Sequence, residues 1–240
     1  MRFVRTVAAL LVTSAVLCGS AAAQPVYNIL DIGVAAGGSG SEGFFVSPNG
    51  HWATGRTLFS TSSGAFEWSP SALAYLGSLA TRPFGVGNGV NNAGVVVGTG
   101  STTAFESNPL PLFWYTGFVA QLPLPAGETS ARAQAINGAN VAVGSANSGS
   151  AERGVIYSGF VQSGSGTATI ITQTTANGSF VRTAVGINDS GRIVGQGIDP
   201  NAAGRNVGYV LDTATGKAFE VGALPGFNGA LNFGVSKAAT

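Results

Sequence analysis

The stretch GINDSGRIVG, residues 186–195, places an apolar residue before a polar turn and a short apolar segment after it. It recurs as GVNNAGVVVG at residues 89–98, as AINGANVAVG at 135–144 and, more loosely, as FVSPNGHWATG at 45–55. The apolar anchors of these copies and of an incomplete fifth are spaced by 44, 46, 51 and 48 residues: Val46, Val90, Ile136, Ile187 and Val235. Such a period is typical of propeller blades and helical arrays. Because Gly, Thr and Val fill the units, we expect four short strands in each unit rather than helices.

The order of strands within a unit follows from its apolar and aromatic segments. Strand a ends at the anchor, as at residues 184–187, and a tight turn joins it to strand b. Strand b is expected at 95–98, 141–144 and 192–195, and strand c, which carries aromatic residues, at 65–68, 112–115, 154–157 and 208–211. Strand d is expected at 74–76, 119–122, 168–171 and 219–221, with an isolated copy at 27–32.

This pattern predicts an all-β, β-propeller-like array of four-stranded repeats, with four nearly complete blades and parts of a fifth. The repeat units cover about residues 46–89, 90–135, 136–186 and 187–234, with partial units at both ends. Since the sequence stops inside the fifth copy, FGVSKAAT at 233–240, we expect a truncated piece of a longer protein. The alternative is a closing blade that lacks its middle strands.

The first 24 residues, MRFVRTVAALLVTSAVLCGSAAAQ, have the pattern of an export signal. Arg2 and Arg5 precede an apolar run at 7–17, and three alanines at 21–23 suit a signal peptidase, so we expect cleavage between Ala23 and Gln24. The run is too short to span a bilayer. We therefore expect a signal peptide at 1–23, a repeat domain at 24–240, and a secreted or cell-surface location, with the periplasm as an alternative. A lipoprotein acylated at Cys18 ranks second, because the preceding residue is Leu17.

Composition after cleavage excludes several classes of function. The single Cys and two arginines are removed with the leader, which leaves no thiol and a near balance of 9 basic and 10 acidic side chains. This excludes a disulfide framework and cysteine catalysis, and it gives no electrostatic basis for binding nucleic acid or an anionic membrane. No later stretch is apolar for long enough to predict a membrane span in the mature chain.

Three elements together resemble the HAF-type family of bacterial extracellular repeats. The turn I-N-x-x-G-x-V-V-G matches residues 187–195, the A-F-x-W strand matches 65–68, and a D-L-G-x-L-like strand matches 75–79. Shorter copies of the last element lie at 31–33 and 221–224, and Gly64 stands where the family usually has a histidine. The resemblance covers nearly all of residues 27–240. It implies an extracellular or cell-surface β-propeller-like repeat, and it implies neither a defined catalytic activity nor functional residues.

The recurring turns have two interpretations, a metal site or structural turns. The shared residues are Asn91, Asn137 and Asn188, together with Gly94 and Gly191, and Asp189 is the one acidic residue in the four complete turns. A calcium loop needs several convergent oxygen ligands, whereas Asn and Gly suit tight hairpins, so we expect structural turns. His51 is the only histidine, so no zinc ligand set can be assembled, and we expect no metal or cofactor.

Catalysis would require acidic side chains to meet. Asp31, Glu67 and Glu220 lie on expected strands, but their spacing does not bring any two together across a glycosidic bond. The aromatic residues of strand c occupy equivalent places in the repeats, which favours packing between blades over stacking on sugars: Phe66, Trp68, Phe113, Trp114 and Tyr157. No catalytic residue is assigned.

The variable loops carry the better prediction of a binding site. In an up-and-down blade the b–c and d–a loops share one face, and these loops differ between repeats, so any ligand site is expected there. We assign 11 of the 19 mature charged residues to them: Glu42, Arg56, Arg82, Glu106, Glu128, Arg132, Glu152, Arg153, Arg182, Asp199 and Arg205. Arg132 and Arg182 recur four and five residues before their anchors, and Arg82 precedes Val86 by four. These three arginines are candidate ligand-binding residues for an anion, and the alternative is a repeated structural contact between blades.

The sequence therefore favours an exported, non-enzymatic repeat protein that serves as a surface structural or interaction module. Its expected ligand is a carbohydrate or an anion on the long-loop face, and its expected partners are a polysaccharide or a cell-surface protein. The alternative is a propeller-type polysaccharide hydrolase or lyase. Convergence of His51, Asp31 or Glu220 with another acid in a pocket on that face would favour the enzyme.

Overall fold

The computed structural model describes residues 29–147, 149, 151–163, 166–202 and 204–222. The chain divides into two units, Met1–Asp31 and Ile32–Thr240. Of the first unit, only residues 29–31 are described, and they are exposed and lie in no strand. The expected signal peptide and the fifth copy of the turn lie outside the described residues. The isolated strand expected at 27–32 is wrong for 29–32, because this segment pairs with no other strand.

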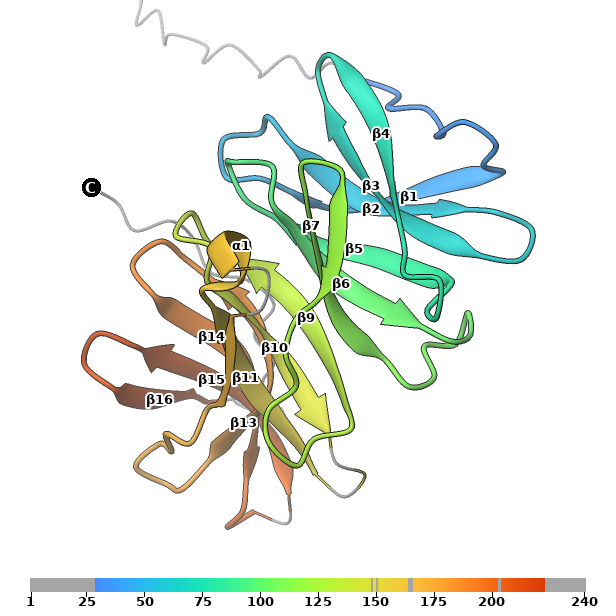
Figure 1. Ribbon diagram of the computed structural model, residues 1–240. Helices are drawn as coiled ribbons and strands as arrows, with labels where there is room; N and C mark the ends of the chain where they lie inside the picture. Colours follow the sequence, from blue (N-terminus) through green and yellow to red (C-terminus); the bar gives the residue numbers. More distant parts are fainter. Residues whose placement is uncertain (1–28, 148, 150, 164–165, 203, 223–240) are drawn as a thin grey trace, which may run out of the picture. The chain divides into compact units, whose positions relative to one another are not determined.

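The second unit consists of four consecutive antiparallel meanders (Figure 1). The first two repeats contain β1 (Gly40–Val46), β2 (Ala53–Leu58), β3 (Ser63–Ser69), β4 (Ala72–Gly77), β5 (Phe84–Val90), β6 (Val96–Ser101), β7 (Leu110–Tyr115) and β8 (Phe118–Gln121). The last two contain β9 (Ser130–Ile136), β10 (Ala142–Asn147), β11 (Glu152–Ser158), β12 (Thr167–Ile170), β13 (Phe180–Ile187), β14 (Arg192–Asp199), β15 (Arg205–Asp212) and β16 (Lys217–Val221). One helical turn, α1 (Phe160–Ser163), separates β11 from β12. The all-β prediction and the a-b-c-d strand order of the four repeats are confirmed.

Neighbouring repeats meet in the same way each time. The first strand of a repeat packs against the first three strands of the repeat before it: β5 on β1–β3, β9 on β5–β7, and β13 on β9–β11. A bridge between Ser63 and Phe84 also joins the first two repeats into one sheet of eight strands. Among the described residues, no strand pairing links the first repeat to the fourth, so these four repeats form no closed barrel or ring.

Strands a, b and c extend further than the sequence predicts on the side away from the tight turns. Strand b of the second repeat continues to Ser101 instead of ending at Gly98, and β14 continues to Asp199. As a result, Arg56, Arg132 and several other charged residues assigned to loops lie within strands. The reason is that short polar and glycine residues still pair through the backbone, which the hydrophobic pattern does not reveal.

The expected role of the strand c aromatics in packing is confirmed. Phe66, Trp114 and Tyr157 are buried, and Phe113 of the second repeat contacts Phe160 of the third with ring centroids 5.1 Å apart. A core of this kind between repeats means that each repeat is stabilised chiefly by its neighbours.

The glycine that ends the turn motif has a steric cause. Each strand a carries a β-bulge, and the bulged backbone passes directly over one residue of strand b. A Cβ atom there would lie inside van der Waals contact with a carbonyl oxygen of strand a, and this holds in every repeat: Gly55, Gly98, Gly144 and Gly195. The bulge therefore requires glycine at this position of strand b, and this steric requirement explains the V-V-G pattern without any ligand.

Candidate functional site

The turn motif is a structural connection between repeats. Asn137 Oδ1 accepts hydrogen bonds from the backbone N–H groups of Ala139 and Val141, both at 3.0 Å, and thereby closes its own turn. Its Nδ2 donates to the carbonyl of Asn188 in the next turn at 3.1 Å. Asn91 repeats this arrangement one repeat earlier and donates to the carbonyl of Asn137 at 3.0 Å. These buried amides therefore link successive turns in register.

Asp189, the acidic exception among the turns, also serves this connection. Its Oδ1 accepts a 2.7 Å hydrogen bond from the backbone N–H of Gly138 in the preceding turn. Within the described residues, no group of three or more Asp, Glu or His side chains is placed to hold a metal ion. The structural interpretation of the turns is therefore confirmed by their hydrogen bonds.

The candidate catalytic groups stand in different places. His51 lies exposed on the first tight turn, with its ring edge-on to Trp52 at 5.1 Å. Glu67 is half-buried on β3, and burial raises the pKa of its carboxyl. Asp31 belongs to the first unit, and Glu220 lies on β16 of the fourth repeat. His51, Glu67 and Glu220 are absent from the linings of four cavities formed by the described residues.

Glu220 does have an acidic neighbour. Arg205 Nη2 donates to Asp199 Oδ2 at 2.9 Å and to Glu220 Oε1 at 3.2 Å, so one guanidinium joins both carboxylates. Ser179 Oγ also donates to Glu220 Oε2 at 2.9 Å. These bonds occupy the acids with donors from β15 and from the loop before β13. Neither acid lines any of the cavities described below.

Arg132 and Arg182 each form an ion pair with the preceding repeat. Arg132 on β9 pairs with Glu106, which lies in the loop between β6 and β7. Arg182 Nε lies 3.3 Å from Glu152 Oε2 at the start of β11. The contact between blades that the sequence offered as an alternative therefore exists. The sequence reasoning missed the two glutamates, although their separation of 46 residues equals that of the anchors Val90 and Ile136.

Arg82 does not occupy the same position as these two arginines. It lies before β5, and its Nη1 donates to a backbone carbonyl at 2.9 Å. Val86 is the strand partner of Thr99, which follows Gly98, and Arg132 is the strand partner of Ser145, which follows Gly144. Val86 therefore occupies the position in the second repeat that Arg132 occupies in the third. The Arg82 Nε is buried without a hydrogen-bond partner among the described groups. The structure therefore does not bring the three predicted arginines into one ring.

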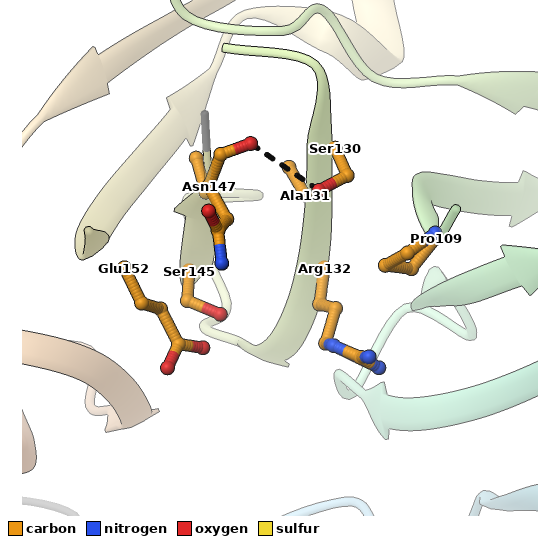
Figure 2. Close-up of a pocket in the computed structure, with 8 residues that line it drawn as sticks. Pro109, Ser130, Ala131, Arg132, Ser145, Asn147 and Glu152 are labelled. Carbon is orange, nitrogen blue, oxygen red and sulfur yellow. Dashed lines mark hydrogen bonds between the residues drawn. The ribbon is translucent and has the colours of Figure 1, made fainter. Parts of the chain in front are cut away.

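A polar cavity of about 280 Å³ opens beside Arg132 (Figure 2). Arg132 and Glu152 stand on opposite sides, and Ser145 lies between them with its side chain toward the opening. Ser130 and Asn147, whose Oγ and carbonyl are 3.3 Å apart, lie at the other end. The lining comes from the outer ends of β9, β10 and β11, on the face that bears the b–c and d–a loops.

A second cavity, of about 360 Å³, opens on the same face between the first and second repeats. Phe59 and Phe84 supply apolar lining, Ser60 and Thr61 supply hydroxyl groups, and Glu106 forms part of the wall. Glu106 thus lines this cavity while its ion-pair partner Arg132 lines the first one. The two cavities flank a single ion pair.

Comparison with known proteins supports the fold alone. TolB from Acinetobacter baumannii, a β-propeller protein, is similar with a TM-score of 0.50 and 12% identity, over 73% of this chain and 41% of the TolB chain. The present chain thus spans less than half of TolB. No protein-family profile matches the sequence, and no curated protein matches it. No helix within the described residues is long and apolar enough to cross a membrane.

Proposed function

We propose that this chain is part of an exported β-propeller-like repeat protein of the HAF type, which acts by binding rather than by catalysis. The repeating pattern of strand packing, the turn motif and the similarity to TolB support the propeller-like architecture. The basic and apolar leader followed by three alanines supports export to the periplasm or the cell surface.

The observation that carries the binding proposal is the pair of cavities on the long-loop face. Apart from Arg132, Glu106 and Glu152, whose ion pairs recur, the lining residues differ between repeats, whereas the other recurring residues are engaged in turns, bulges and contacts between repeats. Variable side chains on a repeated scaffold are where recognition is usually located. The ligand is a carbohydrate or an anion, presented by a polysaccharide or by a cell-surface protein.

Hydrolysis or lysis of a polysaccharide is the competing function. Asp199 and Glu220 share a partner, since Arg205 donates to both. A glycosidase needs one carboxylic acid that keeps its proton and a second carboxylate that faces the sugar. Because Arg205 donates to both acids, it holds them in one structural cluster, which supports binding over catalysis.

The test uses the secreted full-length chain and a panel of immobilised neutral and acidic polysaccharides. We expect retention on at least one polysaccharide and no increase in reducing ends or unsaturated products during long incubation. Product formation that is abolished by Glu220→Gln would establish the enzyme instead. Failure to bind any member of the panel would reject carbohydrate and anion binding together. N-terminal sequencing of the exported protein tests cleavage before Gln24.

A further inference from the structure

The loop between β6 and β7, residues 102–109, presents an aromatic ring to solvent. Phe105 is 94% exposed, whereas the other exposed phenylalanines among the described residues are between 38% and 55% exposed: Phe44, Phe45, Phe118 and Phe219. Its neighbours Ala104 and Glu106 line the larger cavity, and Pro109 at the end of the loop lines the smaller one. Phe105 therefore lies on the loop that contributes residues to both cavities.

This loop is held in a fixed conformation by its own hydrogen bonds. The Thr102 N–H donates to the carbonyl of Ser107 at 3.2 Å, and the Glu106 N–H donates to the carbonyl of Thr103 at 3.1 Å. Glu106 adopts a φ of 57°, a left-handed conformation that is unfavourable for a residue with a side chain. The surrounding bonds and the ion pair with Arg132 hold it there. The backbone that carries Phe105 is therefore held in one conformation before it meets a ligand.

The charges around the cavities are compensated. Four charged residues line the two cavities, and each has an ion-pair partner: Arg56 with Glu42, Arg132 with Glu106, and Glu152 with Arg182. An anionic ligand would have to compete with a carboxylate for each of these arginines. A neutral ligand can instead accept from an arginine and donate to a glutamate of the same pair.

Hydroxyl groups complete the set of polar contacts. Ser145 in the smaller cavity and Ser60 and Thr61 in the larger one make no side-chain hydrogen bond to any described group. A hydroxyl group donates and accepts, and so does each hydroxyl of a sugar. The C–H face of a sugar ring, in turn, suits an exposed aromatic ring. Each cavity is near the lower limit of the volumes of ligand pockets, about 300–1,000 Å³, and therefore suits one ring each.

Resting on the proposed binding function, we infer that these two cavities and Phe105 form one site for a neutral oligosaccharide. Successive sugar units would occupy the two cavities on either side of the Arg132–Glu106 pair. Phe105 would stack on the unit that crosses the loop between them. This assignment selects the neutral class from the two ligand classes that the long-loop face admits.

The test measures calorimetric affinities of the full chain for neutral hexasaccharides of glucose, xylose and mannose, and for hexagalacturonate as the acidic probe. At least one neutral hexasaccharide is expected to bind, and Phe105→Ala is expected to weaken it about fivefold. Ser145→Ala, which removes one hydroxyl without adding volume, should weaken the same ligand about threefold. Phe219→Ala is the matched control, because Phe219 is an exposed phenylalanine on β16 of the fourth repeat. The Phe219→Ala variant should bind the same hexasaccharide with the affinity of the unmodified chain.

The outcomes separate this inference from the function on which it rests. Binding of hexagalacturonate alone would overturn the neutral class and leave the binding function intact. Neutral binding that is unchanged in both Phe105→Ala and Ser145→Ala would place the site elsewhere. Binding of no probe would reject the site and the proposed function together. A change of oligomeric state in Phe105→Ala without a change in affinity would assign the ring to contacts between protein molecules.

Discussion

Replacing Gly55 by alanine should strongly destabilise the protein, although it adds one methyl group. Gly55 on β2 faces Gly43 across the β-bulge of β1, and a Cβ atom on Gly55 would overlap the backbone carbonyl of Glu42. That carbonyl belongs to a paired strand and cannot move aside as a flexible side chain could. Overpacking usually costs 1–3 kcal/mol, and a rigid backbone obstacle favours the upper end, about 3 kcal/mol. For a domain of this size such a loss corresponds to a fall in Tm of about 6–12 °C.

Gly43→Ala is the matched control for this substitution. Gly43 is the strand partner of Gly55, yet a Cβ atom there would meet nothing within 4 Å. We expect its stability to remain within about 0.5 kcal/mol of the unmodified chain. The assay is urea unfolding followed by the fluorescence of the three tryptophans, with midpoints compared at equal slopes. If Gly55→Ala and Gly43→Ala unfold at the same urea concentration, the bulge is not the reason for the repeated glycine.

Three further predictions concern buried polar groups. Asn137→Ala should lower the free energy of unfolding in urea by about 2–3 kcal/mol, because it removes two hydrogen bonds that close the turn and the one that Asn137 donates to the Asn188 carbonyl. An unchanged unfolding midpoint would contradict the link between turns. Burial raises the pKa of Tyr209 to about 12, so the neutral phenol stabilises the fold fully below pH 10 and this contribution is lost as the pH rises through 12. Because burial raises the pKa of Tyr157 as well, absorbance titration should show at least two late, unfolding-linked phenolates, and ionisation of all tyrosines near pH 10 would refute the prediction. Because burial raises the pKa of Glu67, the charged carboxylate destabilises the folded state. Glu67→Gln should therefore raise the urea midpoint of unfolding at pH 7 and leave it unchanged at pH 3. A lower midpoint at pH 7 would contradict a destabilising role of the charge.

The strand order could be predicted from the sequence because the same pattern of apolar and turn residues recurs in each repeat. A single GINDSGRIVG is ambiguous between a metal loop and a hairpin, but comparison of four copies identifies Asn188 as shared and Asp189 as the exception. The strand ends could not be predicted, since outer residues such as Ser101 and Asn147 are polar and pair through their backbone. The β-bulges could not be predicted either, although the repeated glycine in strand b is a sequence feature that they require.

The candidate site was only half predictable. The long-loop face follows from strand order, and both larger cavities open there. The ion-pair partners of Arg132 and Arg182 could be identified only from the structure, because Glu106 and Glu152 lie 26 and 30 residues earlier in the chain. Phe105 carries no pattern that distinguishes it from a core aromatic, and its exposure follows from a loop conformation that no local sequence rule specifies.

The most direct test of a binding face opposite the tight turns is hydrogen exchange of the full chain with and without a bound hexasaccharide. We expect slower exchange in residues 102–109, 130–132 and 145–147, and no change in the turns at 91–95, 137–141 and 188–192. Slower exchange confined to those turns, with loop 102–109 unaffected, would contradict the assignment and return the ligand to the turn motif.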